Sequence, residues 1–118
     1  MKQRLRDPNR AYVVPRSKSK YGAMPTRIDG HRFASKKEGM RYVLLKDMAN
    51  RGEIEELELQ PRFAIEIKGR KICTYVADFQ YRLDGDLVVE DVKGVRTPVY
   101  RLKKKMVEAV YDFAITEI

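Results

Sequence analysis

The sequence predicts an α/β fold in which a mixed central β-sheet is flanked by two main helices. Helical patterns near residues 36–51 and 98–112 enclose three strand-like runs, and a short apolar segment follows the second helix. A helix between the third and fourth strands permits a parallel crossover, so parallel and antiparallel pairs should occur in one sheet. The predicted order of elements is therefore αβββαβ.

Length and charge indicate one domain with a basic extension. A chain of 118 residues is long enough for one compact domain and too short for two. Residues 1–37 contain eleven Lys and Arg against two Asp, a net of +9, whereas residues 38–118 contain fourteen against fifteen acids, a net of −1. We therefore expect a basic arm over residues 1–22 and a single domain over residues 23–118.

The basic arm favours a polyanionic partner, because Lys and Arg release counterions from a nucleic-acid backbone and steer association with it. A solvated tail that only aids solubility is the alternative. A membrane-surface role is disfavoured because the arm lacks a large apolar face. The candidate DNA-contacting residues are Arg16, Lys18, Lys20, Lys36, Lys37, Lys103 and Lys104.

The first elements are a hairpin and a capped helix. Asp29-Gly30 lies in the middle of residues 26–33 and favours a type I′ turn. Ser35 followed by Glu38 forms a capping box, and Gly52 is suited to the left-handed position that follows a helix. Glu38 begins the helix face that should meet the core, so it is either a capping residue or a site residue.

Three strands should follow, over residues 63–67, 72–83 and 87–93, with turns at Lys68 to Lys71 and at Asp84 to Asp86. The third run is nearly all apolar until Glu90, which is typical of a central strand covered on both faces.

The second helix has its own start signal. Thr97-Pro98 fits an N-cap followed by a first helical residue. Apolar residues then repeat at helical spacing, namely Val99, Leu102, Met106, Ala109, Val110 and Phe113. Residues 114–118 can form a short last strand.

Acidic residues should meet at one end of the sheet. Asp91 and Lys93 share a face because side chains alternate along a strand. A hairpin centred near residue 85 brings Asp78 opposite Asp91 or Val92. Two close carboxylates repel unless one is protonated or a cation lies between them, and a hard cation such as Mg²⁺ takes one or two carboxylates plus waters. The alternative is that Asp91 and Lys93 form a surface ion pair without a function, and that Asp78 is a polar residue near the end of the sheet whose hydrogen bonds are made within the protein.

Several spaced motifs carry a family resemblance. They are Ser35-Lys36-Lys37-Glu38, Leu59-Gln60-Pro61, Tyr75-Val76-Ala77-Asp78-Phe79 and Glu90-Asp91-Val92-Lys93-Gly94. The region from Lys20 to Lys105 thereby resembles the PD-(D/E)XK nuclease superfamily, whose restriction-endonuclease-like core has the order predicted above. It is similar to TnsA-type transposase endonucleases and more similar to small phage and prophage proteins known as a domain of unknown function.

The resemblance implies a role for each matching residue. Asp78 and Asp91 match the two motif acids that bind the metal ion, and Lys93 matches the motif lysine. Glu38 matches the helix acid that completes the catalytic and metal-binding site, and Gln60 matches a glutamine with a supporting role. Two departures from the motif are Ala77 in place of proline, and Glu90 beside Asp91. Strand parity with Lys93 favours Asp91 as the ligand.

The expected function is that of a divalent-metal-dependent DNA endonuclease, with Mg²⁺ or Mn²⁺ as cofactor and a 5′-phosphate product. Analogy with phage junction resolvases extends this to branched DNA, such as Holliday junctions, and to a homodimer. The alternatives are a nickase of the same fold and a DNA-binding module that does not cut. His31 is the only histidine, which disfavours a nuclease that depends on histidine. Cys73 is the only cysteine, so we expect no internal disulfide and a protein of the cytoplasm, or of the host cytoplasm if a phage encodes it. We also expect no membrane partner.

Overall fold

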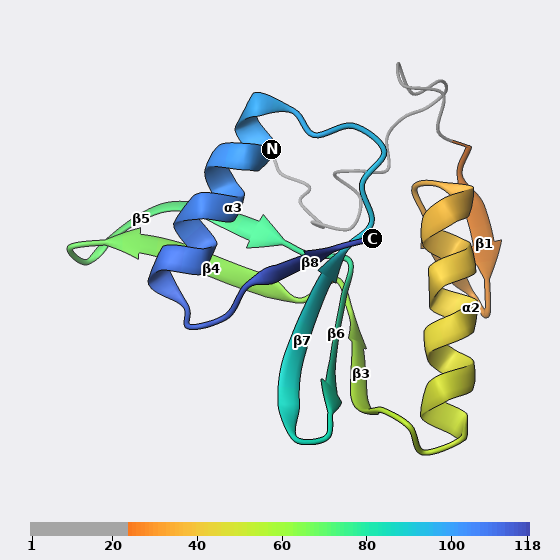
Figure 1. The fold of residues 1–118 in the computed structure, drawn as a ribbon. Helices are drawn as coiled ribbons and strands as arrows, with labels where there is room; N and C mark the ends of the chain where they lie inside the picture. The colour runs from red at the N-terminus through yellow and green to blue at the C-terminus, as the bar shows by residue number, and fades with distance from the viewer. Residues whose placement is uncertain (1–23) are drawn as a thin grey trace. The chain divides into compact units, whose positions relative to one another are not determined.

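The structure, a computed structural model, describes residues 24–118 (Figure 1). Its elements are β1 (Thr26–Ile28), β2 (His31–Phe33), α2 (Lys36–Asn50), β3 (Glu55–Leu59), β4 (Arg62–Ile67), β5 (Arg70–Val76), β6 (Phe79–Leu83), β7 (Asp86–Asp91), α3 (Pro98–Val110) and β8 (Ile115–Glu117). The mixed α/β class and the two helices are confirmed. The predicted arm, with Arg16, Lys18 and Lys20, lies outside the described residues.

The described residues divide into two compact units, one that ends at residue 43 and one over residues 44–118, with the boundary inside α2. Each unit is described by itself, and the prediction of a single domain over residues 23–118 stays a prediction. In the described part of the chain, neither helix is long and apolar enough to cross a membrane.

The described part of the first unit is a hairpin beside the start of α2. Asp29 and Gly30 have φ angles of 53° and 79°, the left-handed values that a type I′ turn requires, so the predicted hairpin is confirmed. A Cβ at Gly39 would lie 2.6 Å from the Thr26 side chain, so only glycine allows this approach. The Tyr42 hydroxyl donates to Asp29 at 2.9 Å.

Helix α2 begins and ends as its sequence predicts. The Glu38 amide donates to the Ser35 hydroxyl at 3.1 Å, which is the N-terminal half of the capping box. At the other end, Gly52 has a φ of 78°. The Gly52 and Glu53 amides donate to the Ala49 and Met48 carbonyls, which together form a Schellman motif.

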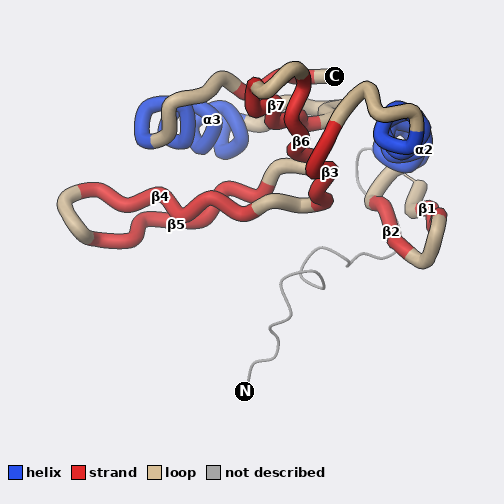
Figure 2. The backbone as a smooth tube through the Cα atoms, turned by 90° about the horizontal axis from the view of Figure 1, so that it is seen from below, coloured by secondary structure: helices blue, strands red, loops and turns tan. Residues whose placement is uncertain are grey.

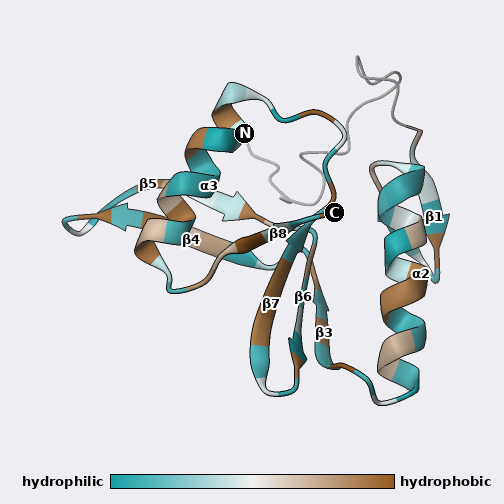
Figure 3. Ribbon diagram, in the orientation of Figure 1, coloured by the Kyte–Doolittle hydropathy of each residue, from teal (hydrophilic) through white to brown (hydrophobic). Residues whose placement is uncertain are grey.

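The second unit contains a four-stranded sheet in the order β3-β6-β7-β8. The pairs β3–β6 and β6–β7 are antiparallel, whereas β7–β8 is parallel, so the mixed sheet and the crossover through α3 are confirmed. Strand β7 lies between two partners, and its middle is hydrophobic whereas its ends are polar (Figure 3). The hairpin between β6 and β7 turns at Asp84-Gly85, where φ is 53° and 87°.

The predicted strand over residues 72–83 is wrong in one respect, because it is two strands in different sheets. Strand β5 pairs with β4, and β6 pairs with β3 and β7. The reason lies opposite the break, where Gln60 has a left-handed φ of 52° and Pro61 has no amide hydrogen to donate. Backbone bonds Ala77 N–Pro61 O and Gln60 N–Asp78 O nevertheless carry the pairing across the bend (Figure 2).

Strand β3 was not predicted. It is rich in glutamate and lies at the edge of the sheet, a position where charged side chains discourage pairing with another chain. Strands are predicted from alternating apolar residues, and the glutamates of β3 do not give that pattern.

The core of the second unit lies between α3 and the strands, and α3 contacts both β4 and β5. Ile65, Val89 and Val107 have no exposed surface. The helix does not bury all the apolar residues that repeat at helical spacing, because Val99 is 65% and Leu102 is 58% exposed. The buried residues of α3 are Tyr100 and Val107, and the side chain of Tyr111 packs against the same core.

Candidate catalytic site

Two carboxylates lie beside the end of β7. Phe79 pairs with Glu90, and the Asp78 amide also donates to the Glu90 carbonyl at 3.0 Å. Asp78 and Phe79 therefore both face Glu90, so the regular register ends there and the pairing of Asp78 with Asp91 stays a prediction. Asp91 is 1% exposed, and the Asp78 carboxylate accepts a 2.7 Å hydrogen bond from the Val92 amide.

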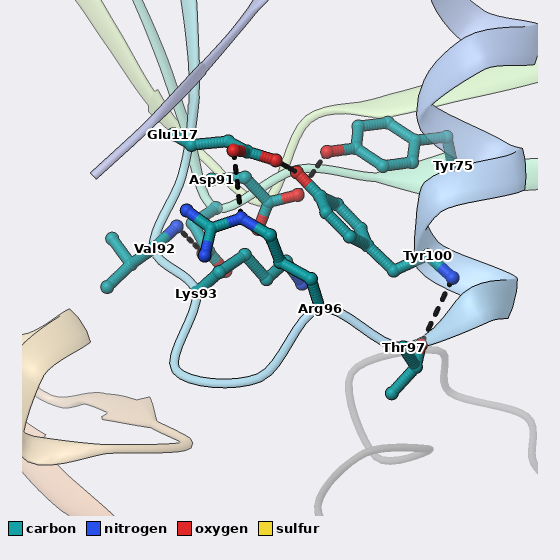
Figure 4. Close-up of polar contacts among 9 residues, drawn as sticks. Tyr75, Asp91, Val92, Lys93, Arg96, Thr97, Tyr100 and Glu117 are labelled. Atoms are coloured by element: carbon teal, nitrogen blue, oxygen red, sulfur yellow. Dashed lines mark hydrogen bonds and ion pairs between the residues drawn. The ribbon is translucent and has the colours of Figure 1, made fainter.

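Lys93 joins this pair although it lies two residues beyond the end of β7. Its ammonium lies 3.2 Å from Oδ1 of Asp91, and 4.4 Å from the centre of the Tyr100 ring (Figure 4). The lysine side chain is 27% exposed. A buried carboxylate is therefore compensated by a cation that still reaches solvent.

Tyr75 on β5 binds the other oxygen of Asp91 (Figure 4). Burial, together with the negative charge of Asp91, raises the pKa of the Tyr75 hydroxyl above its ordinary value near 10. The hydroxyl therefore stays protonated and continues to donate at neutral pH. Lys93 and Tyr75 thus hold Asp91 from two sides.

A third carboxylate, Glu117, was missed in the sequence. It lies on β8, where its register partner is Asp91. It accepts hydrogen bonds from the Tyr100 hydroxyl at 2.8 Å and from Arg96 Nε at 2.9 Å (Figure 4). The bond from Tyr100 first, and that from Arg96 second, lower the pKa of the Glu117 carboxyl. The predicted parallel crossover was the available signal, because parallel strands end at the same edge.

Tyr100 is the link between Glu117 and Lys93. Burial first, and the bond to Glu117 second, raise the pKa of its hydroxyl. The helix that carries it starts with the predicted cap, in which the Tyr100 amide donates to the Thr97 hydroxyl at 3.1 Å. The N-cap of α3 therefore also helps to fix the position of the Tyr100 ring, over which the Lys93 ammonium lies.

Glu90 points away from this group. It is also 1% exposed, but it accepts a hydrogen bond from Tyr81 of β6 rather than from Tyr75 of β5. Consecutive strand residues face opposite sides of a sheet, so Glu90 and Asp91 cannot occupy one site.

Gln60 and Glu38 are the two further predicted site residues. The Gln60 amide donates to the Asp78 carbonyl at 2.9 Å, so Gln60 supports Asp78 through its backbone. Glu38 is 7% exposed in the first turn of α2, and it belongs to the first unit, whereas Asp78, Asp91 and Lys93 belong to the second.

The four predicted DNA-contacting lysines in the described residues differ in their surroundings. Lys36 and Lys37 are exposed at the start of α2. Lys104 is paired with Glu108 at 3.3 Å, and the Lys103 ammonium donates to the Thr74 carbonyl at 3.4 Å. The last two are therefore engaged within the second unit.

The donor set suits a hydrated hard cation. Asp78 and Asp91 offer carboxylate oxygens on neighbouring strands, and Mg²⁺ needs only one or two of these when waters fill its other positions. Across residues 24–118, no group of three or more His, Cys, Asp or Glu side chains is arranged to hold a metal ion. The residues present therefore fit a cation that keeps several waters, and do not form an all-protein cage.

Comparison with known proteins gives a family and no named relative. The chain matches the family described as "Protein of unknown function (DUF1064)" over residues 18–116. No curated protein and no solved structure matches it. Because the match spans the hairpin, both helices and nearly all of the strands of the candidate site, the chain belongs to the DUF1064 family.

Proposed function

We propose that this protein is a divalent-metal-dependent endonuclease of the PD-(D/E)XK type that hydrolyses phosphodiester bonds in DNA. The observation that carries the proposal is the meeting of Asp78, Asp91 and Lys93 where β7 ends. Two acids and a lysine beside the end of one strand are the parts that phosphodiester hydrolysis needs, namely oxygen ligands and a cation near the developing charge.

Each residue has a distinct part in the proposed reaction. A bound Mg²⁺ or Mn²⁺ would supply Lewis-acid chemistry and make water a better nucleophile at neutral pH. Asp78 and Asp91 would hold this ion. Lys93, which already lies 3.2 Å from Asp91, would stabilise negative charge on the phosphate and orient the attacking water. Tyr75 would keep the Asp91 carboxylate in one orientation.

Glu38 is proposed as the third acid of the site. An additional carboxylate would complete the oxygen ligands around the ion. The alternative is that Glu38 serves only to start α2, where its amide bonds to Ser35. Cleavage and thermal melting of Glu38→Ala separate these roles, because loss of a side chain that only caps the helix lowers stability by about 1 kcal/mol and leaves cleavage by the folded protein intact.

A DNA-binding module that does not cut is the second candidate function. Both Asp91 oxygens are engaged, one by Tyr75 and one by Lys93, and this supports a purely structural carboxylate. The catalytic reading explains better why Lys93 approaches from a loop beyond the strand and remains partly exposed. A strand-nicking activity would use the same residues.

The test is incubation with duplex, single-stranded, flapped and four-way DNA in the presence of Mg²⁺ or Mn²⁺. We expect cleavage that a chelator stops and that Asp78→Ala abolishes. Binding to DNA without cleavage in either metal would favour the second candidate. The same panel tests whether branched DNA is preferred, and light scattering of the complex tests the proposed homodimer.

A further inference from the structure

The end of the β4–β5 hairpin carries a cluster of charge that the candidate site does not use. Residues 66–72, here called the ribbon tip, are all exposed. They contain Lys68, Arg70 and Lys71 against the single acid Glu66, a net charge of +2. Within the second unit the tip lies at the far end of the hairpin from β6 and β7 (Figures 1 and 2).

These cations are not neutralised inside the described part of the molecule. Over residues 24–118, no ion pair involves Lys68, Arg70 or Lys71. Glu66 is the strand partner of Lys71, yet the two do not form an ion pair. By contrast, Arg51, Arg82 and Arg96 each lie within 4 Å of an acid. The tip therefore presents charge that an external anion can use.

The turn at the tip carries a second, independent anomaly. Its two residues, Lys68 and Gly69, have φ angles of 52° and 80°. The other two hairpins of this shape place aspartate at the first position, Asp29 and Asp84, each with φ of 53°. Aspartate and asparagine tolerate the left-handed region, whereas lysine gains no local hydrogen bond there. Folding alone favours another residue at position 68.

The tip is connected directly to the candidate site. Strand β5 leads from Arg70 to Tyr75, and Asp78 follows after the bend. Asp78 is seven positions after Lys71, which is at most about 23 Å at the rise of an extended strand, or about seven base-pair steps of duplex DNA. Ile67 and Ile72 beside the cations are 50% and 52% exposed, so apolar contacts to sugars are also available.

Charge elsewhere in the second unit disfavours a path of the polyanion along β3. Residues 53–58 contain four glutamates and no cation, and they include most of β3. A polyanion leaving the site along β3 would meet like charge, whereas one leaving along β5 would meet the ribbon tip.

We propose that the ribbon tip binds the phosphate backbone of duplex DNA and holds the duplex along β5, so that one phosphodiester lies at Asp78, Asp91 and Lys93. The docking at the site rests on the proposed function. The binding by the tip does not, because it requires only the charge and turn geometry described here. A two-stranded ribbon is an element that a DNA groove admits.

The decisive variant is Lys68→Asn, which removes one charge and puts a preferred residue into the left-handed turn. We expect its melting temperature to equal or exceed that of the wild type, while its affinity for duplex DNA falls several-fold. The slope of log affinity against log salt should become shallower by about 0.9 for one lost phosphate contact. In the triple variant Lys68→Asn, Arg70→Gln, Lys71→Gln, the loss of slope should approach about 2.7.

Lys46→Gln is the matched control, because Lys46 is an exposed cation of α2 in the same unit. Equal losses of affinity in Lys46→Gln and Lys68→Asn would show that only net charge matters and would overturn the proposal. An unchanged salt slope in the triple variant would also overturn it. The proposal would also be overturned if the protein bound phosphatidylserine vesicles through the ribbon tip and did not bind DNA through it.

Binding and cleavage distinguish this proposal from the proposed function. If the wild-type protein binds DNA through the tip and never cuts it, the ribbon tip is supported and the nuclease fails. If the protein cuts DNA and the triple variant binds with the wild-type salt slope, the nuclease is supported and the ribbon tip fails.

Discussion

On each face of β7, a buried acid accepts a hydrogen bond from a tyrosine hydroxyl, but the surroundings of the two acids differ. Glu90 and Asp91 are neighbours in sequence, each is 1% exposed, and each accepts a hydrogen bond from a tyrosine hydroxyl. The Lys93 ammonium lies 3.2 Å from Asp91, and on β8 the register partner of Asp91 is Glu117, whereas that of Glu90 is Thr116. Burial and a tyrosine partner therefore do not by themselves mark a functional acid. The proposed chemistry of Asp91 depends on Lys93 and on the other motif acid, Asp78.

The largest expected effect separates these two acids. Asp91→Ala should lower DNA cleavage by at least about 100-fold with DNA binding retained, because affinity comes mainly from Lys and Arg contacts to phosphates. Glu90→Ala should reduce stability and leave cleavage by the folded protein much closer to wild type. Gel-based cleavage, anisotropy and thermal melting of both variants check this. The reverse ranking would mean that the metal ligand is Glu90 and that the comparison is inverted.

The next effect concerns Lys93, the cation beside Asp91. Lys93→Met keeps the length of the side chain and removes its charge, so cleavage should fall by about 100-fold. Affinity for Mn²⁺, measured by calorimetry, should stay the same or rise, since a competing positive charge beside Asp91 is lost. A large loss of Mn²⁺ affinity with intact folding would contradict the role given to Lys93.

A smaller effect compares the two tyrosines. Tyr75→Phe and Tyr81→Phe should each cost about 1–3 kcal/mol of unfolding free energy, because each removes a hydrogen bond to a buried carboxylate. Only Tyr75→Phe should also lower cleavage. Equal cleavage by the two variants at matched folded fractions would remove Tyr75 from the site.

The raised pKa of Tyr75 adds a signature at alkaline pH. The unfolded chain loses this proton near pH 10, whereas the folded protein retains it, so stability is present below pH 10 and is lost as pH rises further. Chemical denaturation between pH 9 and 11 should show this decline, and Tyr75→Phe should make it less steep. A decline of equal slope in both proteins would assign it to other groups.

The smallest effect lies at Glu117. Its pKa is lowered in the folded protein by Tyr100 and Arg96, so its contribution to stability is present above the ordinary glutamate pKa. That contribution is lost as pH falls through the lowered value. Glu117→Gln should therefore flatten the acid limb of the stability curve, and a modest loss of cleavage should follow from a freer Tyr100. An unchanged acid limb would show that the bonds seen on β8 do not persist in solution.

Short-range features of this fold were predictable because they are encoded in adjacent residues. The Asp29-Gly30 turn, the Thr97 cap of α3 and the Gly52 end of α2 each depend on a few neighbouring side chains. The register of β6 and β7, from Leu83 and Asp86 to Phe79 and Glu90, was also predictable, since a hairpin's turn fixes the register of the pairs that follow it.

The remaining features depend on contacts between distant parts of the chain. The bend at Gln60 comes from a left-handed backbone at a residue that does not require one, so composition gave no warning. Tyr75 reaches Asp91 only because this bend takes β5 out of the sheet and beside α3. Glu117 needed the register of a parallel pair, which no turn specifies.

The parallel crossover to β8 also has a consequence for the order in which the candidate site assembles during folding. Asp78 and Asp91 belong to a single hairpin, which closes a short loop and can form within about 10 μs. Glu117 is 26 residues farther along the chain than Asp91, and α3 lies between β7 and β8 in the sequence. Loop closure of this length costs entropy before any contact repays it. The two aspartates should therefore meet early, and Tyr100, which depends on Glu117, should settle over Lys93 last.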